Sequence, residues 1–463
     1  MSNNTFAMVL VIVLGAWTLL LAMTGWLRRT GLLLHNAAWI IAFGVIGSGV
    51  IRYVPVSGYT WGLLIGGIAA FNIGMMVPHS FESRCREDPI QTTPAILMSR
   101  RGFLLLMMGY TAGFALYISR VISTFGLSGL VHNPSNARAL AGPVIASVPI
   151  YGKLLLYLGP FLLVLAFNRW TIRPRISRLS LVVIVLYLVL TLLATLQRTN
   201  LFTAIAWELA VLLLLPGSRK QMSLGKGARC LTSSPSKRGR RVVGGMLVAA
   251  VALASFQYLA AILHKTGVKN PAIESALAPV LQKSSFASLF VYASGGVPAF
   301  SQLVSSPNRE IPPPDPSGAP VLGNYNPQTW GEATFSTLLK VLPLAKPWNP
   351  VAPFIQVPFA YNVYTWFEPY YRDFRTPGVI LMTFGSGIAI ALVVRRRHRS
   401  AAWMLLAALL VGMTVFAAFA NRYIDDYTIE YTLVLLWLGR RGRVTAVTDS
   451  RPLAALLPSL PHS

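Results

Sequence analysis

Apolar segments separated by polar, mostly basic loops recur along the whole chain. A helix needs roughly 17–25 predominantly apolar residues to cross the hydrocarbon core of a bilayer, and most of these segments reach that length. The pattern predicts an all-α polytopic membrane protein, a bundle of about 11 transmembrane helices. The segments are 5–26, 32–50, 59–77, 102–119, 147–167, 179–196, 201–216, 242–263, 377–394, 401–419 and 428–438, of which 201–216 and 428–438 are short.

One stretch, residues 265–376, breaks this pattern because it contains no segment long enough to span a bilayer. It holds 16 of the 31 prolines and many aromatic residues. Apolar stripes at helical spacing from Phe286 and from Phe335 predict short helices that lie in the membrane interface. We therefore expect a large extracytoplasmic cap loop. The expected organisation is helices 1–8 over 1–264 with a basic cytoplasmic loop at 217–241, the cap loop at 265–376, helices 9–11 over 377–438, and a cytoplasmic tail at 439–463.

The positive charge is distributed unevenly between alternate loops. Of the 40 Lys and Arg residues, 26 lie on one side, in 27–31, 78–101, 168–178, 217–241, 395–400 and 439–463. Basic loops stay on the cytoplasmic side, so the N-terminus is expected outside and the C-terminus inside. The net charge of +26 lies beside membrane spans and is accompanied by no nucleic-acid-binding motif. We expect anionic membrane lipid, and no nucleic acid, as the partner of these charges.

Several basic residues fall at the outer ends of predicted spans, where a charge needs a partner or water. Arg198 lies at a tight outer turn between two spans, and Arg120 and Arg138 flank an outer loop. A planar guanidinium binds phosphate oxygens through two parallel hydrogen bonds and stays charged in any environment. Converging arginines would therefore form a diphosphate site. The sequence contains no CxxC or HExxH motif, and we expect no protein metal site.

The densest motif in the chain is NVYTWFEPYYRDF, which ends directly before a predicted span. Upstream lie a Gly-Gly-x-x-x-Phe segment at 295–300 and a Gln-Arg-Thr turn at 197–199. In these features the chain resembles the Wzy-type O-antigen and oligosaccharide repeat-unit polymerases, whose outer loop carries N-x-Y-T followed by Y-x-D-F-G. The glycine that closes the family pattern is Arg375 here. The matching residues are Asn362, Tyr364, Thr365, Tyr371, Asp373 and Phe374.

The resemblance implies a metal-independent membrane glycosyltransferase that needs no cofactor. Such a polymerase moves a growing glycan from its undecaprenyl diphosphate carrier onto a new lipid-linked repeat unit, at the outer face of the bacterial cytoplasmic membrane, and builds a surface polysaccharide. Its partners would be the lipid-linked oligosaccharide and membrane lipid, and the family allows for a chain-length regulator.

Individual residues of this chain fit the roles that such a reaction needs. Fixed arginines would neutralise the leaving diphosphate, and a carboxylate or imidazole would deprotonate the acceptor hydroxyl. The assignments are Arg198, Arg138 and Arg120 to the diphosphate, Asp373, Glu368 or His264 to the base, and Asn362, Tyr364, Thr365 and Tyr371 to the acceptor glycan.

Two other functions fit parts of the pattern. An O-antigen ligase uses the same donor but transfers finished glycan to lipid A core, and ligases commonly carry an essential histidine in a large outer loop. The histidine nearest to this loop is His264, at its edge. A lipid or glycan transporter would usually show repeated halves, and no internal repeat is evident. Polymerisation is therefore the expected function.

Overall fold

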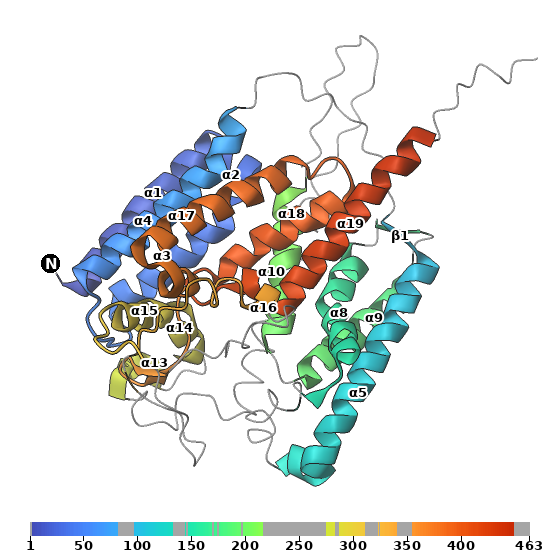
Figure 1. Ribbon diagram of the computed structural model, residues 1–463, viewed down its shortest axis with the longest axis horizontal. Coiled ribbons are helices and arrows are strands. Elements are labelled where there is room, and N and C mark those ends of the chain that lie inside the picture. Colours follow the sequence, from blue (N-terminus) through green and yellow to red (C-terminus); the bar gives the residue numbers. More distant parts are fainter. Residues whose placement is uncertain are drawn as a thin grey trace, which may run out of the picture.

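The computed structural model is mostly helical, and its long helices run side by side in a bundle (Figure 1). It describes residues 2–81, 97–132, 144, 147–168, 171–173, 176–195, 198–215, 275–282, 287–310, 323, 325–339 and 354–448. The predicted span at 242–263, the cytoplasmic loop at 217–241 and the last part of the tail lie outside the described residues.

Each predicted span within the described residues overlaps a helix. Short α2 (Trp26–Thr30) joins the first two of them. The long helices are α1 (Asn3–Met23), α3 (Leu32–Ser48), α4 (Gly58–Ser80), α5 (Arg100–His132), α8 (Ile150–Phe167), α9 (Arg178–Ala194), α10 (Arg198–Leu214), α17 (Glu368–Arg395), α18 (Ala401–Met413) and α19 (Asp426–Thr448).

The apolar surface of the bundle is typical of a helical membrane protein. Large apolar side chains are exposed on its outer faces, among them Ile12 and Leu19 of α1 and Leu105 of α5. Such exposure is unfavourable in water but not in lipid, where only the backbone must be internally bonded. Among the described residues, five helices are long and apolar enough to cross a membrane: Asn3–Met23, Gly58–Ser80, Arg100–Gly126, Ile150–Phe167 and Glu368–Arg395. Shorter apolar helices accompany them at Leu32–Ser48, Arg178–Ala194, Thr199–Leu214 and Ala401–Phe416.

Helix α17 packs closely along α4 because glycines line the contact. A Cβ atom on Gly74 would lie 2.3 Å from the carbonyl oxygen of Phe384, and one on Gly387 would lie 2.6 Å from that of Phe71. Small residues let two backbones approach, and the resulting dispersion contacts hold helices together in lipid. These two helices therefore depend on glycine at the places where they touch.

We expect Gly74→Val to force α4 and α17 apart and to lower the free energy of unfolding by about 2 kcal/mol or more, because the new side chain meets backbone atoms that cannot move aside. Gly62→Ala on the same helix is the matched control, since a Cβ there meets nothing within 4 Å. Thermal unfolding in detergent measures both variants. Equal melting temperatures for Gly74→Val and the wild type would contradict the packing described here.

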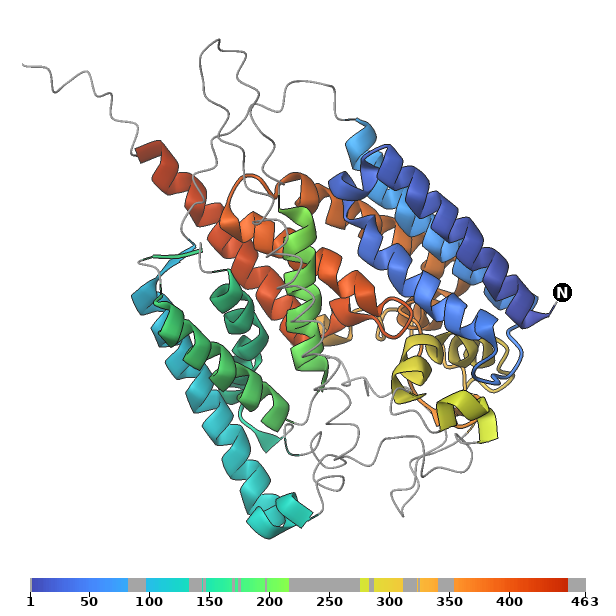
Figure 2. The same cartoon turned by 180° about the vertical axis from the view of Figure 1, so that it is seen from behind.

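Helices α8, α10, α18 and α19 form the centre of the bundle (Figures 1 and 2). Trp207 Nε1 of α10 donates a hydrogen bond to the carbonyl oxygen of Leu405 in α18 at 2.8 Å. The Trp207 ring also lies 5.4 Å from that of Tyr431 in α19. Glu208 is the next residue of α10, and its buried carboxylate accepts a hydrogen bond from Asn168 Nδ2 at 2.6 Å. These contacts tie the four helices to one another.

The described part of the predicted cap lies at one end of the bundle (Figure 1). It contains α13 (Pro279–Gln282), α14 (Ala287–Ser294), α15 (Gly296–Val304), α16 (Ser336–Leu339) and an antiparallel pair, β3 (Ile355–Gln356) with β4 (Ala360–Tyr361). The stripes from Phe286 and Phe335 correspond to α14 and α16. However, α14 packs on α3 with Ala287 and Val291 buried. The described residues of the predicted stripe, Leu289, Phe290 and Ala293, are half-buried, and their place in the membrane interface stays a prediction.

The paired glycines Gly295 and Gly296 lie where the cap touches the bundle. A Cβ atom on Gly296 would lie 2.3 Å from the carbonyl oxygen of Ala418, and one on Gly295 would lie 2.8 Å from that of Val291. The sequence pattern did not predict α15, which begins at Gly296. The Gly-Gly motif thus permits a close approach between a cap helix and the chain that follows α18.

The opposite end of the bundle carries basic residues. There β1 (Met98–Ser99) pairs in parallel with β2 (Ile172–Arg173). Arg100 and Arg101 begin α5, while α17 ends at Arg395, whose Nη1 donates to the carbonyl oxygen of Pro78 at 2.8 Å. The charge asymmetry of the sequence is therefore also an asymmetry between the two ends of the fold.

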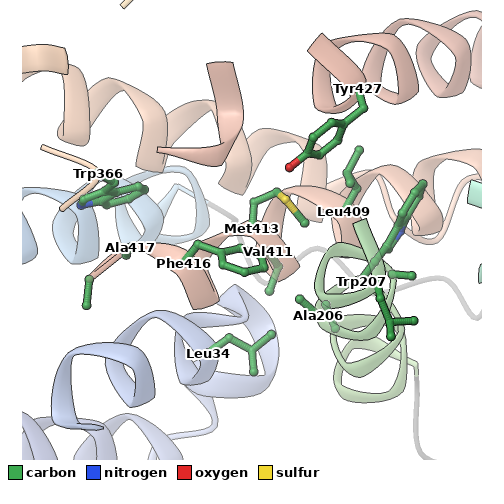
Figure 3. Close-up of a cluster of buried hydrophobic side chains, with 14 of the residues drawn as sticks. Leu34, Ala206, Trp207, Trp366, Leu409, Val411, Met413, Phe416, Ala417 and Tyr427 are labelled. Carbon is green, nitrogen blue, oxygen red and sulfur yellow. The ribbon is translucent and has the colours of Figure 1, made fainter. Parts of the chain in front are cut away.

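The last part of the predicted cap inserts between the helices. The backbone nitrogen of Trp366 donates to the carbonyl oxygen of Ala417 at 2.9 Å, and its ring lies 5.4 Å from that of His35 in α3. Phe367 stacks on Trp39 of α3 at 5.3 Å. α17 accordingly begins at Glu368, before the span start predicted at 377. Figure 3 shows the apolar layer around this insertion, with Trp366, Ala417, Phe416, Leu34 and Val411.

Candidate functional site

A cavity of about 520 Å³ lies where the described cap meets the bundle. One wall comes from residues 362–369 of the sequence motif, and a second comes from residues 419–427, between α18 and α19. Tyr157 of α8 and residues near the start of α16, such as Thr337, complete the lining. The second wall includes the short 3-10 helix η4 (Arg422–Ile424), which follows η3 (Thr414–Phe416) along the chain.

Four of the residues proposed from the sequence meet in this cavity, namely Asn362, Tyr364, Thr365 and Glu368. Their backbone is held in place because the next residues, Trp366 and Phe367, are anchored among α3 and α4. Burial raises the pKa of the Tyr364 hydroxyl well above its usual value. The phenol therefore stays protonated at neutral pH and can donate a hydrogen bond.

The second wall holds a fixed cation. Arg422 Nη1 donates to Asp425 Oδ2 at 3.0 Å, and the hydroxyl of Tyr427 donates to the same oxygen at 2.5 Å. The guanidinium also lies 5.4 Å from the centre of the Phe419 ring. Burial alone would lower the pKa of Arg422, but the attraction of Asp425 and Tyr427 and their hydrogen bonds together outweigh it, and the pKa is raised. This arginine is consequently charged and held in one orientation.

Asp426 connects this wall to the cap. Thr337 Oγ1 of α16 lies 2.8 Å from Asp426 Oδ1 and also contacts the carbonyl oxygen of Ile424. The cavity lining thus contains three carboxylates, those of Glu368, Asp425 and Asp426, and one guanidinium. Carboxylates accept hydrogen bonds from hydroxyl groups and repel anions. The lining therefore suits a polyhydroxylated ligand better than a phosphate.

Glu368 is held from behind by Arg372, which lies one helical turn further along α17. Arg372 Nε donates to Glu368 Oε1, and the guanidinium lies 5.8 Å from the centre of the Tyr364 ring. The side chain of Arg372 is 0% exposed and that of Glu368 is 17% exposed. Glu368 and Tyr364 line the cavity, whereas Arg372 is buried behind them.

Asp373, the first of the proposed bases, does not line the cavity. It is 0% exposed. Its Oδ1 accepts hydrogen bonds from Thr329 Oγ1 at 2.5 Å and from the Ala333 backbone nitrogen at 3.2 Å, and its Oδ2 accepts one from the Thr334 backbone nitrogen at 2.7 Å. These bonds join the second turn of α17 to the turn before α16. The geometry favours a structural role for Asp373 and leaves Glu368 as the proposed base that faces the cavity.

Tyr371 also lies away from the cavity lining. Its ring is covered by the guanidinium of Arg375 at 5.3 Å, and Arg375 Nη2 donates to the carbonyl oxygen of Asn326 at 3.2 Å. Arg375 has a φ of 55° and interrupts α17. Residues other than glycine rarely adopt this conformation. In this chain the Asn326 contacts hold Arg375 in that conformation.

The described residues do not test whether the three arginines assigned to the diphosphate lie together. Arg198 is the first residue of α10, and its side chain is not among the described ones. Arg120 is exposed on α5. Arg138 and His264 lie outside the described residues. Their proposed roles therefore stay predictions.

The polar residues of segment 421–427 were not among the site residues assigned from the sequence. A signal was present, because Arg422, Asp425 and Asp426 lie in a short loop between two apolar spans, where charges are rare. Their place on the cavity could not be predicted, because the opposite wall comes from a distant part of the sequence.

The described residues contain no group of three or more His, Cys, Asp and Glu side chains that could hold a metal ion. What the cavity does offer is an ionisable carboxylate at Glu368, a fixed guanidinium at Arg422, and tyrosine and asparagine side chains. In comparisons with known proteins, no family model, no curated protein and no solved structure matches this chain.

Proposed function

We propose that this protein is a membrane glycosyltransferase that polymerises oligosaccharide repeat units carried on undecaprenyl diphosphate, in the manner of the Wzy-type polymerases it resembles. The main support is the cavity at the junction of cap and bundle, whose lining includes Asn362, Tyr364 and Thr365 of the family motif together with Glu368. Carboxylates and amides hydrogen-bond sugar hydroxyls, and tyrosine rings pack against sugar faces. A cavity at the end of an apolar bundle also suits a substrate with a sugar head and a lipid tail.

In this proposal Glu368 takes the proton from the acceptor hydroxyl. The acceptor oxygen then attacks the anomeric carbon of the donor glycan, and the bond between that carbon and the diphosphate oxygen breaks. The electron pair leaves with the lipid diphosphate, whose charge requires nearby cations. The arginines predicted for this role are Arg198, Arg138 and Arg120, whereas Arg422 on the cavity is already paired with Asp425.

The proposed orientation places the cap end of the bundle outside the cytoplasmic membrane. Arg100, Arg101 and Arg395 lie at the other end of the bundle, and basic residues are retained on the cytoplasmic side. The N-terminus would then be outside and the C-terminus inside. The cavity would open at the face of the membrane where flipped lipid-linked repeat units arrive.

Deleting the gene in its host should replace a ladder of polymer lengths on a glycan gel with a single repeat unit, and a plasmid copy should restore the ladder. Free polymer that is not attached to lipid A core would indicate a ligase. Lipid-linked units retained at the cytoplasmic face would indicate a transporter. An unchanged ladder would contradict all three functions.

A further inference from the structure

The buried guanidinium of Arg372 stands out among the charged groups of the described chain. It is 0% exposed, and its Nη1 and Nη2 have no hydrogen-bond partner among the described residues. Within that part of the chain, its polar contact is with Glu368 alone, through Nε and Oε1. The remaining stabilisation comes from the Tyr364 ring, 5.8 Å away.

Stability does not explain such a pair. Removing a guanidinium from water costs more than a single ion contact restores, and an apolar pair of similar volume is often as stable or more stable. A helical pair four residues apart that served only stability would also work at the surface, at a lower desolvation cost. The arginine must therefore contribute something other than net stability at this position.

The geometry indicates what that contribution is. Arg372 contacts one oxygen of Glu368 from the buried side, while Glu368 and Tyr364 form part of the cavity wall. The adjacent Asp373 is bonded to Thr329 and to the backbone of 333–334, so the helical turn that carries Arg372 is fixed to the cap. A carboxylate held in this way loses the rotational freedom that would take it out of line with a substrate hydroxyl.

We propose that Arg372 is a positioning residue that holds the Glu368 carboxylate in the orientation needed to take the proton from the acceptor hydroxyl. This inference rests on the proposed function. Arg372 does not touch the substrate, and its effect on the rate passes entirely through Glu368. The Asp373 bonds supply the rigid support that the arginine itself needs.

The test uses membranes that contain the full-length protein and a synthetic repeat unit on a polyprenyl diphosphate, with kcat and acceptor KM measured separately. Arg372→Gln should lower kcat by about 10- to 100-fold and leave KM within about twofold, because orientation and not affinity is lost. Arg372→Lys should recover part of kcat, since an ammonium can still contact Glu368. Glu368→Gln should be the more damaging single change.

The double variant Glu368→Gln/Arg372→Gln separates positioning from folding. It removes both charges, so it should be produced in wild-type amounts even where Arg372→Gln alone is not. Its kcat should lie within about twofold of Glu368→Gln alone, because the arginine acts only through the carboxylate. A double variant slowed by the product of the two single effects would overturn the inference, as would a Glu368→Gln protein with full kcat. Failure of the proposed function looks different, because the wild type would then show no polymerisation of this substrate.

Discussion

Glu368→Gln is expected to lower the rate of polymerisation, measured per amount of folded protein, by about 100-fold or more. Glutamine keeps the size of the side chain and an oxygen that can accept the Arg372 bond, so the cavity wall should keep its shape. It cannot accept a proton from the acceptor hydroxyl. Polymer length on a glycan gel and turnover in isolated membranes measure the loss.

Glu332→Gln is the matched control for this prediction. Glu332 belongs to the same cap region and is exposed, but it does not line the cavity. Removing its charge should leave both turnover and stability unchanged. If Glu368→Gln formed polymer as fast as this control, the base would have to be another group, such as Asp426 or His264.

The features of the fold that follow from local composition could be predicted from the sequence. α3 and α18 begin at the predicted residues, Leu32 and Ala401, because an apolar run and its polar flank are read from neighbouring positions. The start of α17 could not be found in this way. Glu368, Arg372 and Asp373 make its first turns look like an outer loop, and only the burial of these charges among partners from the fold explains a helix there.

In the candidate site, too, features that are local in the sequence could be predicted and those that depend on the fold could not. The motif from Asn362 to Glu368 could be identified because its residues are adjacent in the sequence, and the structure places four of the proposed residues on one cavity. Arg422 and Asp425 were missed because the short loop between two predicted spans gives no information on which other segment it faces. The insertion of Trp366 beneath α3 decides which segments meet, and that contact joins parts of the chain that no local pattern connects.

Asp373→Asn should reduce the amount of folded protein and lower the free energy of unfolding by about 2 kcal/mol or more, since the bonds it weakens are bonds to a charged group. Three donors point at this carboxylate. An amide nitrogen in place of Oδ2 would face the N–H of Thr334, and one in place of Oδ1 would face the N–H of Ala333. In either orientation of the asparagine, its amide N–H group therefore faces a backbone N–H group. Two donors then face each other in a fully buried site.

Two comparisons show whether the loss belongs to this cluster. Thr329→Val removes only the hydroxyl that donates to Asp373 Oδ1, so it should cost less than Asp373→Asn. Glu332→Gln, an exposed change in the same turn, should shift the free energy of unfolding by no more than about 0.5 kcal/mol. Thermal unfolding in detergent ranks the three variants. Asp373→Asn that melts like the wild type but forms no polymer would instead show that Asp373 acts on the reaction through the position of Arg372 and Glu368, because a group needed only for folding cannot abolish activity in a protein that is fully folded.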